Sequence, residues 1–174
     1  MVHRAKTWSL CAAALMMPVT ASAQQATPEP AAILELGGAV ETGLNHRETS
    51  YGPSIAAEFT PIEHVLEIEG GVTPLFHRGQ TEWDVDLLFK KPWTLSDKAE
   101  FMAGIGPSWS HTVDHGRHED SFAIEAALDF MFWPGRSRKL GWFVEPSYSY
   151  GLANEHEQSL AVSAGLLIPI GHRR

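Results

Sequence analysis

Apolar and polar side chains alternate along most of the chain after Ala31, in segment after segment separated by turn residues. This alternation predicts β-strands with one apolar and one polar face, because successive side chains of a strand point to opposite sides. We find no convincing helical period. Eight segments fit the strand pattern, at 34–41, 54–59, 66–72, 82–89, 100–109, 122–132, 142–149 and 160–170.

The two faces of the predicted strands differ in chemistry. One face is bulky and often aromatic, as in Trp83, Val85, Leu87 and Phe89, whereas the other is rich in Gly, Ala, Ser and carboxylates. A tilted strand of roughly 9 to 12 residues spans the apolar band of an outer membrane, about 25 Å tall. The pattern therefore predicts an all-β fold, an eight-stranded antiparallel up-and-down transmembrane β-barrel with a small, acidic lumen.

The first residues have the composition of a secretory signal peptide. Arg4 and Lys6 precede an apolar run over 8–19, and Ala21-Ser22-Ala23 is a typical cleavage site. The run is shorter than the roughly 20 residues that a membrane-spanning helix needs. We expect residues 1–23 to be the signal, 24–30 a flexible lead-in and 31–174 one barrel domain in the outer membrane. The single cysteine lies within the signal, so the mature chain has no thiol.

Charge narrows the possible partners and environments. The chain has a formal net charge of −8, and the signal removes two basic residues and no acidic ones, which argues against a nucleic-acid partner. The main structural alternative is a soluble, lipocalin-like barrel with its apolar face inward, but a soluble exterior normally mixes both signs. The basic residues instead fall in predicted connections, with Lys98 at a strand start; the others are Arg47, Arg78, Lys90, Lys91, Arg117, Arg136, Arg138 and Lys139.

Aromatic residues support the membrane interpretation. Five tryptophans near predicted strand ends suit the interfacial girdles of membrane barrels; they are Trp83, Trp93, Trp109, Trp133 and Trp142. On these features the chain resembles the small outer-membrane β-barrel proteins over Ala31 to Ile170. The resemblance implies a monomer inserted by the outer-membrane assembly machinery and in contact with lipid and lipopolysaccharide. The chain departs from this class by ending near Ile170 without the aromatic residue that commonly closes the last strand.

The predicted lumen carries many carboxylates without a basic partner in the strands: Glu35, Glu58, Glu67, Glu69, Glu82, Asp84, Asp86, Glu100, Glu125, Asp129 and Glu145. Buried carboxylates do not stay ionised unpaired, so they hold protons, share a hydrated lumen with cations, or pair with arginines from the connections. We predict a cation-binding lumen site at Glu67, Glu69, Glu82, Asp84 and Asp86. A hydrated lumen would also provide a narrow cation-selective path, although eight strands usually leave a filled interior.

An even number of strands gathers alternate connections at one end of the barrel. Six histidines fall near that end: His46, His77, His111, His115, His118 and His156. Among them, His111, Asp114, His115 and His118 are candidate ligands for a divalent metal such as Zn²⁺, which would dissociate as the imidazoles protonate near pH 6. The alternative is that these are ordinary polar loop residues.

Serine and histidine also occur near the predicted rims, as Ser108, Ser110 and His111 and again as His156 and Ser159. Some barrels of this size modify lipid A with such residues, but no ordered triad is recognisable here. We therefore expect no catalytic residues and no cofactor other than a divalent metal. The favoured function is a non-enzymatic barrel that presents His- and acid-rich surface loops, with narrow transport and lipid A modification as alternatives.

Overall fold

The computed structural model describes residues 30–45, 47–135, 138–152 and 156–171 of the 174-residue chain. None of these residues forms a helix long and apolar enough to cross a membrane. The described chain is built from eight strands: β1 (Ala32–Gly43), β2 (Thr49–Ile62), β3 (Leu66–His77), β4 (Gln80–Ser96), β5 (Ala99–Asp114), β6 (Arg117–Phe132), β7 (Gly141–Gly151) and β8 (Gln158–Ile170).

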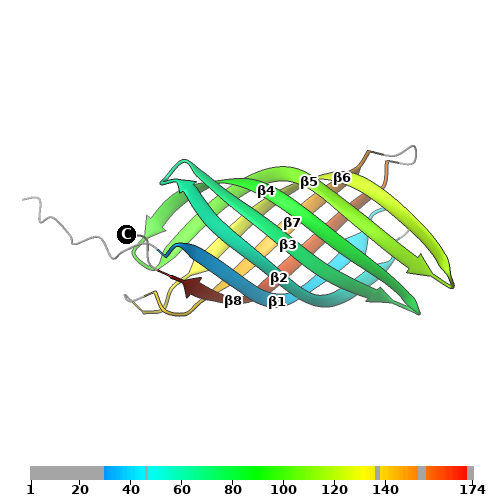
Figure 1. The fold of residues 1–174 in the computed structure, drawn as a ribbon, viewed down its shortest axis with the longest axis horizontal. Coiled ribbons are helices and arrows are strands. Elements are labelled where there is room, and N and C mark those ends of the chain that lie inside the picture. Colours follow the sequence, from blue (N-terminus) through cyan, green and yellow to red (C-terminus); the bar gives the residue numbers. More distant parts are fainter. Residues whose placement is uncertain (1–29, 46, 136–137, 153–155, 172–174) are drawn as a thin grey trace, which may run out of the picture.

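The strands close into a barrel in sequence order (Figure 1). Each strand pairs antiparallel with its neighbours, and β1 closes the barrel by pairing with β8 from Ala32↔Ile170 to Gly43↔Ser159. Closure leaves no strand edge unpaired, because every strand has a partner on both sides. The predicted eight-stranded antiparallel barrel is confirmed.

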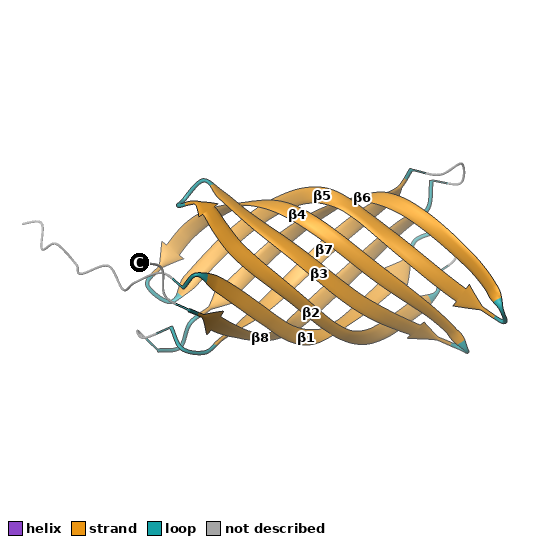
Figure 2. Ribbon diagram, in the orientation of Figure 1, coloured by secondary structure: helices purple, strands orange, loops and turns teal. Residues whose placement is uncertain are grey.

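Connections alternate between the two ends of the barrel (Figure 2). We call the end beside Ala31 and Gly171 the terminal end; the connecting residues 63–65, 97–98, 133–135 and 138–140 lie there. The opposite, distal end carries the connecting residues 44–45, 47–48, 78–79, 115–116, 152 and 156–157. Two of these are two-residue turns, Arg78-Gly79 and His115-Gly116, whose four residues all have positive φ. Positive φ at both central positions matches the twist of a hairpin.

Strands β4, β5 and β6 are longer than the sequence predicted, at 17, 16 and 16 residues. The prediction that Lys90 and Lys91 lie in a connection is wrong, because pairing continues through Lys90↔Gly104 and Lys91↔Ala103 to Ser96↔Ala99. Arg117, also expected in a connection, is the first residue of β6. Strand pairing therefore continues up to the two-residue turns at 78–79 and 115–116, where the sequence predicted longer polar loops.

The predicted faces are correct for most of the barrel. Bulky apolar residues such as Val40, Ile55 and Ile105 point outward and are exposed, whereas their strand neighbours face the lumen. Strands β1 and β8 approach each other closely where Gly37 pairs with Gly165, because a Cβ added at either position would overlap backbone of the neighbouring strand. Trp133 was expected in an outer girdle, but it is 1% exposed and packs inside the barrel.

Several predictions concern residues outside the described part of the chain. The proposed signal peptide at 1–23 and nearly all of the lead-in at 24–30 belong to this group. So do His46 and Arg136.

Candidate functional site

The interior of the barrel has three levels with different chemistry. At the terminal end, five buried side chains form a cluster that we call the apolar plug: Met102, Met131, Trp133, Phe143 and Leu167. These residues come from β5, β6, β7 and β8 and from the residue that follows β6. Each is 3% exposed or less, so the plug fills this part of the lumen.

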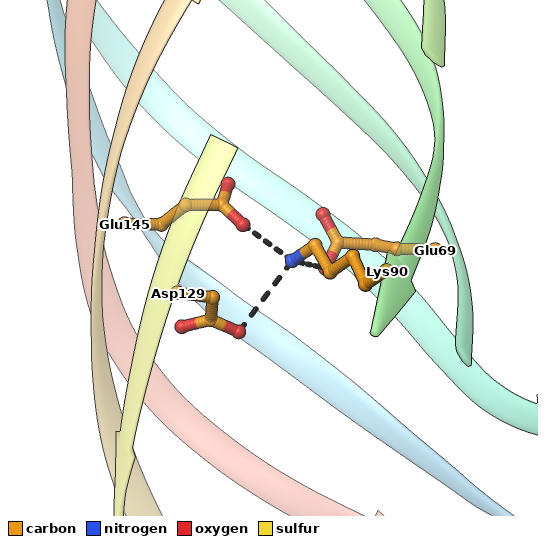
Figure 3. A network of polar contacts seen from close by, with 4 residues as sticks. All are labelled: Glu69, Lys90, Asp129 and Glu145. Atoms are coloured by element: carbon orange, nitrogen blue, oxygen red, sulfur yellow. Dashed lines mark hydrogen bonds and ion pairs between the residues drawn. The ribbon is translucent and has the colours of Figure 1, made fainter. Parts of the chain in front are cut away.

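Next to the plug, the ammonium group of Lys90 lies among three carboxylates (Figure 3). Lys90 donates to Glu69 Oε2 and Glu145 Oε2, and its Nζ lies 3.5 Å from Asp129 Oδ2. The four side chains come from β3, β4, β6 and β7, so this ion network ties together strands across the lumen. Lys90 is 1% exposed, and three carboxylates compensate for the loss of its hydration.

The expectation that the lumen carboxylates have no basic partner in the strands is therefore wrong. Lys90 faces the lumen because the alternation of β4 continues past Phe89, which places Leu88 and Lys90 inside and Phe89 and Lys91 outside. A further carboxylate pairs with an arginine from a connection, which is one of the alternatives that the sequence predicted. Arg138 Nη1 donates to Glu100 Oε1 over 2.8 Å at the terminal end.

Four buried carboxyl groups converge beside the ion network. Glu35, Glu58, Glu69 and Asp129 each offer an oxygen, and these oxygens all lie within 4.8 Å of one another. They are 3% exposed or less. Among the described residues, this is the only group of three or more His, Cys, Asp or Glu side chains whose ligand atoms converge this closely.

The distal half of the lumen is an open acidic cavity of about 610 Å³, which we call the acidic well. Its wall includes Glu41, Glu82, Asp84, Asp86 and Glu125, and Glu145 lies at the level of the Lys90 network. Serine side chains lie beside three of these carboxylates, Ser159 beside Glu41, Ser110 beside Glu82 and Ser147 beside Glu125. Among the described residues that line the well there is no lysine; its one basic residue type is histidine, as His77 and His156.

The structure divides the predicted cation-binding residues between two levels. Glu82, Asp84 and Asp86 line the acidic well, as a hydrated cation site requires. Glu69 instead contacts Lys90 below the well, and Glu67 lies nearby, beside Glu58. The five residues therefore do not form a single site.

The predicted metal-binding residues lie on the β5–β6 hairpin, but only some of them come together. His118 Nδ1 is 3.3 Å from His111 Nε2, and His111 Nδ1 is 2.8 Å from Asp120 Oδ1. Asp114 and His115 contact each other at the turn, with 2.5 Å between Asp114 Oδ1 and His115 Nδ1. The spacing that suggested one four-ligand site belongs to a long hairpin, whose alternation separates neighbouring side chains onto opposite faces.

The serine and histidine residues near the rim do not form a nucleophile–base pair. Ser110 lines the well and shares a 2.6 Å hydrogen bond with Ser121. His111 alternates to the other face of β5 and stacks on Trp109. His156 Nδ1 is 3.3 Å from the carbonyl oxygen of Gly151.

Sequence reasoning missed Lys90 as a lumen residue and did not single out Glu35, Glu58 and Asp129. A signal for Lys90 was present, because apolar alternation resumes at Trp93 and keeps Lys90 in phase with the lumen face. The convergence of four carboxyl groups from β1, β2, β3 and β6 has no local signal, because their positions lie far apart in the chain.

Comparison with protein-family models finds no match, and comparison with curated proteins finds none either. Solved structures do resemble the barrel, and they show its fold. Neisserial surface protein A aligns with a TM-score of 0.63 at 11% identity, covering 80% of this chain and 96% of its own. The N-terminal barrel domain of Pseudomonas aeruginosa OprF aligns with a TM-score of 0.56 at 10% identity, covering 78% of this chain and 97% of its own. The attachment invasion locus protein Ail of Yersinia pestis aligns with a TM-score of 0.53 at 10% identity, covering 80% of this chain and 97% of its own. The predicted resemblance to small outer-membrane barrels is confirmed for the fold.

Proposed function

We propose that this protein is a non-enzymatic, integral outer-membrane barrel that is exported by a cleaved signal peptide and binds cations in the acidic well at its distal end. The observation that carries the proposal is the distribution of side chains about the barrel wall. Bulky apolar residues cover the outside, while carboxylates and one buried lysine occupy the inside. A water-soluble barrel places these groups the other way round.

The outer surface carries two aromatic bands. Near the terminal end, the rings of Trp93, Phe101 and Phe130 lie side by side across β4, β5 and β6, and the ring centroids of Phe132 and Trp142 lie 4.1 Å apart. Near the distal end, aromatic residues pair across strands, as in Tyr51↔Phe76 and Trp109↔Phe122. Aliphatic residues occupy the outer face between the bands. Such a belt suits hydrocarbon flanked by two membrane interfaces.

The acidic well supports cation binding. The barrel wall around its carboxylates has a low dielectric constant. Their negative potential is therefore concentrated in the hydrated space inside the barrel. Serine hydroxyls lining the same space are additional oxygen ligands for a cation. By contrast, the apolar plug packs buried side chains into the terminal part of the lumen, which weighs against a conducting path. The separation of Ser110 from His111 weighs against lipid A modification.

Charge substitution on the outer face tests the membrane proposal. Ile105 lies midway along β5 and is 58% exposed, so Ile105→Arg should destabilise the barrel in phospholipid vesicles by about 2–4 kcal/mol. His64→Arg, at an exposed position in the terminal connection 63–65, is the matched control and should change the free energy of unfolding by less than about 0.5 kcal/mol. Urea unfolding measured by tryptophan fluorescence gives both values. Equal and small effects would indicate a water-exposed outer face.

Titration with spermidine tests the well separately, because this trication is too large to reach the buried carboxylates. Removing one charge with Asp84→Asn should weaken binding about two- to fivefold, and raising the salt concentration should weaken it further. Binding that is insensitive to both changes would exclude the well. Planar-bilayer recording of the same protein should show no cation-selective conductance.

A further inference from the structure

The carboxyl groups of Glu35, Glu58, Glu69 and Asp129 outnumber the donors available to them. Glu58 and Glu69 are direct cross-strand partners on β2 and β3. Both face the lumen, and like charges in this arrangement repel each other. The ion pairs of Lys90 go to Glu69, Asp129 and Glu145, so Glu35 and Glu58 have no ion pair with it. The side chain of Glu67 adds a further carboxyl group beside Glu58.

Three of the four residues have side-chain oxygens that are buried without a hydrogen-bond partner. They are Glu35 (Oε1), Glu58 (both oxygens) and Asp129 (Oδ1), on side chains that are 2%, 1% and 0% exposed. Asp129 uses its other oxygen, Oδ2, toward Lys90, which leaves Oδ1 for another ligand (Figure 3). A buried carboxylate oxygen with no partner is costly, so its presence in a cluster of four acids points to a missing positive charge.

We infer that Glu35, Glu58, Glu69 and Asp129 form a buried site for one hard divalent cation, with Ca²⁺ as the best fit. The available ligands are all oxygens, which favour Ca²⁺ over the nitrogen- and sulfur-preferring Zn²⁺. Ca²⁺ accepts oxygens at about 2.3–2.6 Å, so two ligands on opposite sides of it lie about 5 Å apart. The four oxygens, within 4.8 Å of one another, fit that span. Mg²⁺ requires a tighter octahedron and usually keeps several waters.

This site is distinct from the acidic well and does not depend on it. None of the four residues lines the well, whereas Glu145 does, and the side chain of Lys90 bridges from Glu145 to Glu69. The four-carboxylate site shares Glu69 and Asp129 with the Lys90 network, and Lys90 links it to Glu145 on the wall of the well. An ion in this site is loaded as the barrel folds or exchanges slowly afterwards, because each ligand is at least 97% buried.

The test measures bound calcium in the full mature protein. The barrel is refolded in detergent with CaCl₂, treated with EDTA and analysed for metal by mass spectrometry. We expect one Ca²⁺ per chain to survive a brief EDTA wash and Mg²⁺ not to replace it. Refolding with Ca²⁺ at a hundredfold excess over its Kd should raise the melting temperature by roughly 5–10 °C relative to refolding with EDTA.

Matched variants separate this site from the well and from a purely structural role of the acids. Glu58→Gln and Glu35→Gln keep the side-chain shape and should lower Ca²⁺ affinity by at least about tenfold, since even outer-shell changes cost that much. Asp84→Asn, in the well, should leave the retained calcium unchanged while weakening spermidine binding. The proposal is overturned if the wild-type barrel holds no stoichiometric Ca²⁺ and melts at the same temperature in Ca²⁺ and EDTA. Loss of calcium in Asp84→Asn equal to that in Glu58→Gln would also overturn it, because the ions would then belong to the well.

Discussion

The two halves of the lumen are built from the same strands but differ in chemistry. The terminal half holds the apolar plug with the Lys90 network and its carboxylates packed beside it, since Leu167 pairs with Glu35 and Met102 with Asp129. The distal half is the acidic well. Because the wall is continuous, this contrast comes from the choice of inward-facing residues at each level. The terminal half of the lumen is therefore closely packed, whereas the distal half leaves an open space lined by carboxylates.

Removing the charge of Lys90 should have the largest effect, because Lys90 joins the two halves. Lys90→Met leaves Glu69, Asp129 and Glu145 without their shared cation and should lower the free energy of unfolding by about 3–5 kcal/mol. Lys91→Met is the matched control, since Lys91 is exposed on the outer face, and it should cost less than about 0.5 kcal/mol. Urea titrations of the two variants in the same detergent give the comparison. Equal losses would show that the network contributes nothing specific.

The apolar plug can be tested with two adjacent leucines of β8. Leu167 is fully buried in the plug, whereas Leu166 is 49% exposed on the outer face. Leu167→Ala should cost about 2–5 kcal/mol, because it leaves a cavity in a packed cluster. Leu166→Ala should cost less, because lipid or detergent fills the space beside the shortened side chain. Unfolding midpoints measured in parallel check this order, and a larger loss for Leu166 would place the packed core outside the barrel.

Removing a single charge from the acidic well should have a smaller effect on stability, and in the opposite direction to the two substitutions above. Asp84 lies among Glu41, Glu82 and Glu125, so Asp84→Asn relieves repulsion and should stabilise the barrel by up to about 1 kcal/mol at low salt. The gain should shrink as salt is added. Asp97→Asn, in an exposed turn at the terminal end, provides the control and should change neither value. Destabilisation by Asp84→Asn would mean that this carboxylate has an essential partner in the well.

The smallest effect on stability is expected at the distal hairpin. His118→Ala should leave the unfolding midpoint nearly unchanged but remove any Zn²⁺ binding at this hairpin, because His118 lies against His111. His115→Ala should retain binding, since His115 contacts Asp114 at the turn instead. Calorimetric zinc titration near neutral pH compares the two variants. Equal loss in both variants would favour the original four-ligand site.

Much of the fold could be predicted from the sequence. Alternation is a local property with a period of two, so it identified eight strands and assigned most residues to the outer face or the lumen without knowledge of their partners. Glu82, Asp84 and Asp86 were correctly placed in the lumen for this reason. The prediction was wrong where local composition resembles a turn. Lys90-Lys91-Pro92 interrupts the apolar face, yet it continues β4 because the carboxylates inside compensate for Lys90.

The level of each inward-facing residue was decided by the tertiary structure. Alternation states which face a side chain occupies, but the stagger between tilted strands determines which residues meet across the lumen. Glu35, Glu58, Glu69 and Asp129 converge only after β1 has paired with β8 and the barrel has closed. The register between β3 and β4 in turn places Glu82, Asp84 and Asp86 in the well but Glu67 and Glu69 at the level of Lys90. The sequence by itself determined an apolar outside and an acidic inside, whereas closure decided which acids share a cation.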